Sequence, residues 1–174
     1  MQVRTKIREL PEKPSAGLRV CLDDLRFLEG HKDYKVDLNS WHSPEEHQDE
    51  TGNYFICRVC VGGAHLARLA DAPSEKIDPD CFMGLSERER GKIQAMNAFR
   101  LGVIDWGVRG YYGYEQTHPA FPDLEDDIRE VGKWADKTIN EQGILGCPPN
   151  YENDREAFFK FLYGLADRLE KAGH

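Results

Sequence analysis

The sequence predicts a mainly α fold: a single compact helical domain with a buried central helix and a minor β-strand or hairpin near residues 33–40. Two observations support this class. Five or six stretches carry apolar residues at helical spacing and are separated by turn chemistry, whereas only one short stretch alternates with the period of a strand. At 174 residues and 40% hydrophobic content, one domain over residues 15–174 is expected, after a partly flexible basic segment over residues 1–14.

The first two predicted elements are a helix and a strand. A helix over about residues 15–29 is predicted by apolar spacing and by Gly30 as its stop. Its apolar positions are Leu18, Cys21, Leu22, Leu25 and Leu28. In "DYKVDLNSW", Tyr34 and Val36 alternate with polar residues, which predicts a half-buried strand that must pair with something, and a small hairpin is expected. The following segment, to about residue 53, is interpreted as a polar loop.

The predicted central helix covers residues 53–71, "NYFICRVCVGGAHLARLAD", the most apolar run of the chain. Its polar residues Arg58, His65 and Arg68 fall on one narrow stripe. Gly63 and its neighbouring glycine each cost about 1 kcal/mol in a helix interior. The expected compensation is a neighbouring backbone that approaches closely.

Helical patterns continue towards the end of the chain. Ser86 and Glu89 form a capping box that opens a helix to about residue 103. A short helix or turn is expected in residues 106–114, and a further helix is expected over residues 123–139. A last helix is expected over residues 154–171, with its apolar residues at helical spacing.

Charge and cysteine content limit the class of protein. The formal net charge is −8, which disfavours nucleic acid and anionic lipid as partners. No signal peptide is visible at the N-terminus, and no apolar run reaches the length of a membrane span. The expected compartment is therefore the cytoplasm. Five cysteines without secretory context predict reduced thiols.

A structural zinc site is the sharpest alternative to a purely structural interpretation of the central run. It would use His42, His47, Cys57 and Cys60, a His-x4-His pair followed by a Cys-x2-Cys pair. Against zinc, buried free cysteines usually act as small hydrophobes, so no metal and no cofactor is favoured. A thioredoxin-like redox pair is weaker still. That motif places its cysteines at the start of a helix in a βαβ unit, and no such unit is predicted here.

Other catalytic templates are missing from the sequence, including a nucleophile elbow, a phosphate loop, a zinc-protease helix and a dinucleotide fingerprint. The paired carboxylates Asp23 and Asp24 are interpreted as helix-surface residues. No catalytic residue is predicted, and whether the protein is an enzyme stays open, with a non-enzyme favoured. An aromatic cluster could anchor a partner protein, and the alternative is a satellite core under a loop. The cluster comprises Trp106, Tyr111, Tyr112 and Tyr114, and Arg109 is a further candidate binding residue beside it.

The order "VDLNSWH", "CRVCVGGAHLARLA", Pro79, Phe82 and "KIQAMNAFRLG" resembles a family of small proteins encoded by tailed phages and bacterial prophages. The resemblance covers about residues 34–105. It places the shared positions at Trp41, His42, Cys57, Cys60, Gly63, Ala64, Phe82, Lys92 and Arg100. The family pattern has no histidine at the place of His47. The resemblance implies an origin and packing of His42 near the cysteine pair, but no activity.

Two functions are therefore expected as alternatives. The first is a small acidic accessory protein of phage or prophage type, present as a monomer or homodimer in the host cytoplasm, that binds a host or phage protein without catalysis. The second is a structural zinc-binding or thiol-dependent protein that uses His42 with Cys57 and Cys60. A mimic of nucleic acid is a weaker third, because −8 is a modest charge.

Overall fold

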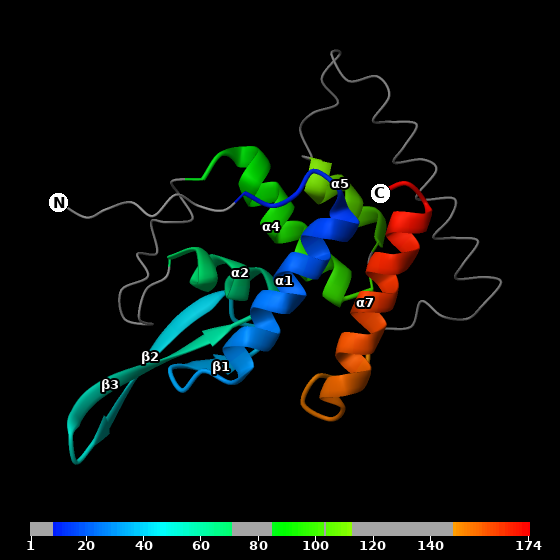
Figure 1. The fold of residues 1–174 in the computed structure, drawn as a ribbon. Coiled ribbons are helices and arrows are strands. Elements are labelled where there is room, and N and C mark those ends of the chain that lie inside the picture. Colours follow the sequence, from blue (N-terminus) through cyan, green and yellow to red (C-terminus); the bar gives the residue numbers. More distant parts are fainter. Residues whose placement is uncertain (1–8, 71–84, 103, 113–147) are drawn as a thin grey trace. The chain divides into compact units, whose positions relative to one another are not determined.

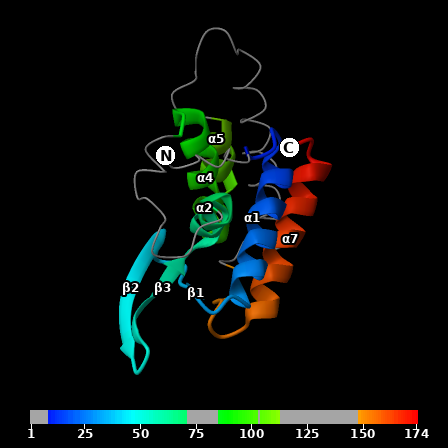
Figure 2. The same ribbon diagram turned by 60° about the vertical axis from the view of Figure 1, so that its left-hand side comes forward.

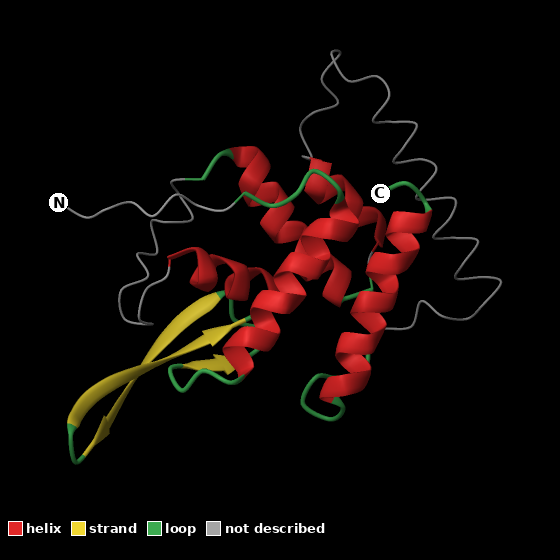
Figure 3. Ribbon diagram, viewed as in Figure 1, coloured by secondary structure: helices red, strands yellow, loops and turns green. Residues whose placement is uncertain are grey.

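The computed structural model describes residues 9–70, 85–102, 104–112 and 148–174. In these residues the chain forms five helices and a three-stranded mixed sheet (Figures 1 and 3). The prediction of a mainly α fold is therefore wrong. Residues 53–59 of the predicted central helix form a strand, and residues 42–49 of the predicted loop form another. The predicted helix over residues 123–139 lies outside the described residues.

The described residues group into two compact units. The first contains residues 9, 20–70 and 85, and the second contains residues 10–19, 86–102, 104–112 and 148–174. Helix α1 (Pro14–Glu29) contributes to both. The division into a basic segment over 1–14 and one helical domain over 15–174 stays a prediction.

The sheet of the first unit is centred on strand β3 (Gly52–Val59). Strand β1 (Tyr34–Val36) pairs parallel to β3, and β2 (His42–Asp49) pairs antiparallel to it. The predicted strand near residues 33–40 is confirmed, but its partner is β3 and not a hairpin neighbour. The predicted polar loop before residue 53 is wrong, since most of it forms β2. Figures 1 and 2 show β2 and β3 as a long twisted hairpin.

The helix α2 (Val61–Ala70) follows β3 after a single residue, Cys60. A Cβ built on Gly63 would lie 1.4 Å from the carbonyl oxygen of Trp41. The expectation that a backbone approaches closely at this glycine is therefore confirmed. Alanine cannot be accommodated there without a shift of the helix or of the residue before β2.

The second unit contains α4 (Glu87–Arg100), α5 (Ile104–Tyr112), α7 (Arg155–Lys171) and the first turns of α1. The predicted cap at Ser86 is confirmed, because its side chain accepts a hydrogen bond from the Glu89 N–H. Asp154 caps α7 through the Ala157 N–H. Arg19 forms ion pairs of 2.6 and 2.8 Å with Asp167 and Glu170 of α7. Local capping signals and apolar spacing thus placed these helices correctly.

Candidate functional site

The Cys57 thiol and the His42 imidazole are in contact across the hairpin. His42 pairs with Val59 and Pro44 pairs with Cys57, so both side chains project from the same face of the sheet. The His42 Nε2 atom lies 3.0 Å from the Cys57 Sγ atom. The expected packing of His42 near the cysteine pair is therefore found, and it arises from strand register and not from a helix.

Burial keeps this pair uncharged. It lowers the pKa of His42 from its ordinary value and raises the pKa of Cys57 to about 12. At neutral pH the contact joins a thiol to a neutral imidazole, whereas a reactive cysteine needs a thiolate stabilised by positive surroundings. Cys57 is also fully buried. The arrangement therefore favours a structural role for this thiol.

Cys60 occupies a different environment. It is the residue between β3 and α2, and its Sγ accepts a hydrogen bond from the Gly63 N–H at 3.4 Å. This is the position of a helix N-cap, where a side chain satisfies one of the unpaired N–H groups of the first turn. The two cysteines therefore do not share a helix, contrary to the predicted helix over residues 53–71, and both are buried.

The four predicted zinc ligands are not brought together. His47 projects from the opposite face to His42, because odd and even strand residues alternate, and its ring stacks on that of Tyr54 with centroids 5.5 Å apart. Cys60 caps α2, as described above. Among the residues that the structure describes, no three His, Cys, Asp or Glu side chains are grouped so that they could hold a metal ion.

Strand β3 leads directly into α2, but the described residues place no second parallel strand after α2, so they form no βαβ unit of the thioredoxin type. Moreover, Cys57 lies inside β3, whereas Cys60 follows the last residue of the strand. A thioredoxin-like pair begins at the start of the helix. The two thiols here have different partners, His42 for one and the Gly63 N–H for the other.

A buried polar cluster connects α1 with α2 in the first unit. Asp24 accepts a hydrogen bond from the His65 Nδ1 atom at 2.7 Å and lies 3.4 Å from the Arg68 Nε atom. Asp24 is only 6% exposed and His65 is fully buried. The interpretation of Asp24 as a surface residue is wrong, whereas the predicted polar stripe holds for His65 and Arg68. A carboxylate that orients a histidine can serve catalysis, but the burial of both side chains favours a structural role for this pair.

The aromatic cluster predicted as a binding surface lies partly outside the described residues. Nothing is described for Tyr114 or for the side chains of Trp106 and Arg109. Tyr111 is fully buried, and its hydroxyl donates a hydrogen bond to the Pro11 carbonyl. Tyr112 is half-buried, with its ring edge-on to that of Tyr111 at 6.2 Å. Tyr111 therefore serves the core of the second unit.

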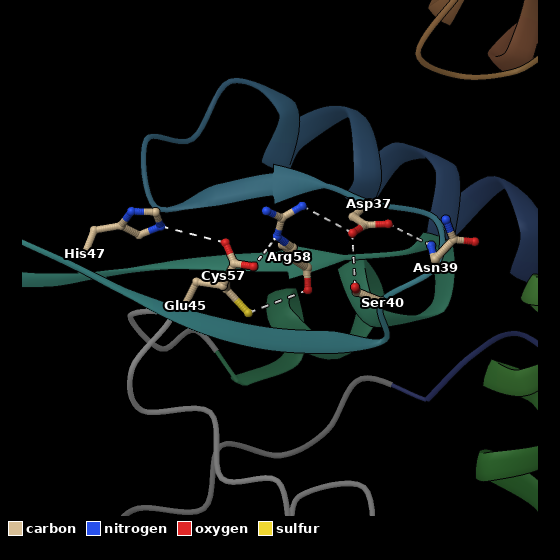
Figure 4. Close-up of polar contacts among 7 residues, drawn as sticks. All are labelled: Asp37, Asn39, Ser40, Glu45, His47, Cys57 and Arg58. Carbon is tan, nitrogen blue, oxygen red and sulfur yellow. Dashed lines mark hydrogen bonds and ion pairs between the residues drawn. The ribbon is translucent and has the colours of Figure 1, made fainter.

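The outer face of the β2–β3 hairpin carries polar and aromatic side chains. This face carries the pairs Ser43 and Arg58, Glu45 and Ile56, and His47 and Tyr54. Tyr54 is 40% exposed. Arg58 forms ion pairs with Glu45 at 2.6 Å and with Asp37 at 3.4 Å (Figure 4). Sequence reasoning missed this face because residues 42–49 contain few strand-forming residues.

Comparison with protein-family models finds no match, and no match is found among curated proteins or among solved structures. No helix in the described ranges combines the length and the apolar character that crossing a bilayer requires.

Proposed function

We propose that this chain is a non-enzymatic accessory protein of phage or prophage type, which binds a host or phage protein through the outer face of the β2–β3 hairpin. The observation that carries the proposal is the exposed Tyr54 ring, which is stacked on His47 and flanked by Ile56 and Glu45. Tyrosine supplies large contact area at low entropic cost, and it is enriched among the residues that dominate binding energy.

The chemistry of the thiols supports binding over catalysis. Cys57 and Cys60 are buried, and the pKa of Cys57 is raised to about 12 by that burial. A protonated and inaccessible thiol is a poor nucleophile. Asp24 and His65 are equally inaccessible.

The net charge of −8 supports a protein partner, and the phage-like order of residues 34–105 supports a phage or prophage origin. An acidic protein is repelled by nucleic acid, so the partner is a protein. The proposed compartment is the bacterial cytoplasm, and the protein acts there as a monomer or homodimer.

Site-specific photo-crosslinking tests the proposal. A benzophenone amino acid replaces Tyr54 on the outer face or, as the matched control, Gln48, which is exposed and projects from the opposite face. The full chain is irradiated in bacterial lysate. We expect one discrete protein adduct from position 54 that excess wild-type chain suppresses, and none from position 48.

The same adduct must then form with the purified partner. Excess wild-type chain must suppress it, and excess Tyr54→Ser chain must not. Equal adducts from positions 48 and 54, or none from position 54, would exclude the outer face as the binding surface.

A second candidate is a structural zinc-binding or thiol-dependent protein that uses His42 with Cys57 and Cys60. The 3.0 Å contact between His42 and Cys57 motivates it, whereas the position of Cys60 as the cap of α2 counts against it. Elemental analysis of the full chain, with melting before and after chelation, tests it. Stoichiometric zinc and a lower melting temperature after chelation would support this candidate. Absence of zinc together with unchanged melting would eliminate its metal-binding form.

A further inference from the structure

Two carboxylates flank the aromatic pair on the outer face of the hairpin. Glu45 precedes His47 by two residues on β2 and Asp49 follows it by two, so all three side chains share one face. A strand rises about 3.3 Å per residue, which places each carboxylate about 7 Å along the strand from the position of the His47 and Tyr54 pair. The stacked pair of His47 and Tyr54 thus lies between two acidic positions along the hairpin.

Both carboxylates are ionised at neutral pH. A hydrogen bond from Arg58 holds the pKa of Glu45 below its ordinary value. The side-chain and main-chain donors of Thr51 do the same for the pKa of Asp49. The hairpin also carries Glu46 and Glu50 and has no lysine or arginine between residues 42 and 57. Its one cation, Arg58, lies at the base of the outer face.

We propose, building on the function proposed above, that this face receives an arginine-bearing segment of the partner protein, with a guanidinium over the Tyr54 ring between Glu45 and Asp49. Guanidinium groups stack on aromatic faces and bind carboxylates through planar pairs of N–H donors. The chain already contains one such contact on this face, since the Arg58 Nε donates to Glu45 at 2.6 Å.

The negative charges of Glu45 and Asp49 favour an arginine-bearing segment over a second copy of the chain as the occupant of this face. A two-fold contact through the same face would bring Glu45 and Asp49 of one copy against those of the other, and like charges in contact are destabilising. An arginine-bearing segment instead complements the excess of carboxylates. Such an interface gains on-rate from electrostatic steering and weakens as salt increases.

Fluorescence anisotropy tests the inference with a labelled nine-residue peptide of alternating arginine and serine as the probe. The matched peptide has citrulline in place of arginine, which keeps the shape and removes the charge. We expect saturable binding of the arginine peptide to the full-length chain at low salt, and markedly weaker binding of the citrulline peptide.

Three variants locate the contact. Asp49→Asn and Tyr54→Ser should each weaken binding about threefold to fivefold, the value of one exposed ion pair or cation–π contact. Glu46→Gln is the matched control, because it removes the same charge from the opposite face, and it should change affinity less than twofold. Circular dichroism confirms that each variant is folded.

Equal weakening by Glu46→Gln and Asp49→Asn would show unspecific attraction and overturn the inference, as would equal binding of both peptides or no saturable binding. Failure here is distinguishable from failure of the proposed function. If crosslinking at position 54 captures a protein while the arginine peptide does not bind, the interface stands and its arginine chemistry is refuted. Self-association in sedimentation that Asp49→Asn strengthens would identify a second copy as the occupant.

Discussion

Replacement of Gly63 by alanine tests the close approach that positions α2 against the sheet. The added Cβ would lie 1.4 Å from the Trp41 carbonyl oxygen and 2.6 Å from its carbonyl carbon. Ordinary contact begins at 3.4 Å, so the helix or the residue before β2 must move by about 2 Å. The obstacle is backbone, which cannot rotate away as a flexible side chain can.

The expected change in the free energy of unfolding on Gly63→Ala follows from two opposing effects. Helix propensity favours alanine over glycine by at most about 1 kcal/mol. Overpacking of a well-packed site costs about 1–3 kcal/mol and more where backbone must shift. We therefore expect Gly63→Ala to lower the free energy of unfolding by about 3 kcal/mol or to prevent folding of the first unit. The sign is opposite to the one that propensity alone predicts.

Urea denaturation monitored by circular dichroism measures the effect, with two control variants. In Gly164→Ala the new Cβ meets nothing within 4 Å in α7, so the stability should rise by up to about 1 kcal/mol. In Gly30→Ala, which lies in the first unit, the Cβ meets only the Phe27 carbonyl oxygen at 4.0 Å, and little change is expected. Unfolding of Gly63→Ala at the same or a higher urea concentration than wild type would refute the reasoning.

Three further substitutions probe buried polar groups. Asp24→Asn breaks the buried cluster and should cost about 3 kcal/mol by urea denaturation, whereas the exposed neighbour Asp23→Asn should cost less than about 0.5 kcal/mol. Lys92→Met leaves the buried Leu10 carbonyl without the donor that now lies at 3.2 Å, and it should cost about 1–3 kcal/mol in the same assay. Because burial raises the pKa of Cys57 to about 12, unfolding releases its proton above about pH 9, so stability should fall between pH 9 and 12, and less steeply in Cys57→Ala.

The helices were predictable because their signals are local. Ser86 and Asp154 each precede an apolar helical pattern and accept the capping hydrogen bond that their side chains predict. Gly30 directly follows the last residue of α1. None of these signals requires knowledge of a distant residue, so spacing and capping alone were sufficient to place these helices.

The hairpin was not predictable in the same way, because its stabilising contacts join residues far apart in sequence. The contacts between Arg58 and Glu45 and between Tyr54 and His47 form only after the strands have paired. Part of strand β3 is continuously apolar and lacks the alternation of polar and apolar residues that marks a half-buried strand, so its pattern also fits a helix. One local signal was available: Asp49 accepts from the Thr51 N–H and Gly52 has a φ of 124°, a turn geometry that glycine favours.

Five of the residues that carry the resemblance come together at the junction of the sheet with α2: Trp41, His42, Cys57, Cys60 and Gly63. His42 contacts Cys57, the Gly63 N–H donates to Cys60, and the Trp41 carbonyl occupies the space that a side chain at Gly63 would need. These contacts join β2 and β3 to the start of α2, so the five residues have structural roles in this chain. Residues that decide the choice of partner are then expected outside the pattern, where the structure exposes Tyr54 between Glu45 and Asp49. The variants proposed for this face therefore separate recognition from stability, which substitutions at Cys57 or Gly63 cannot do.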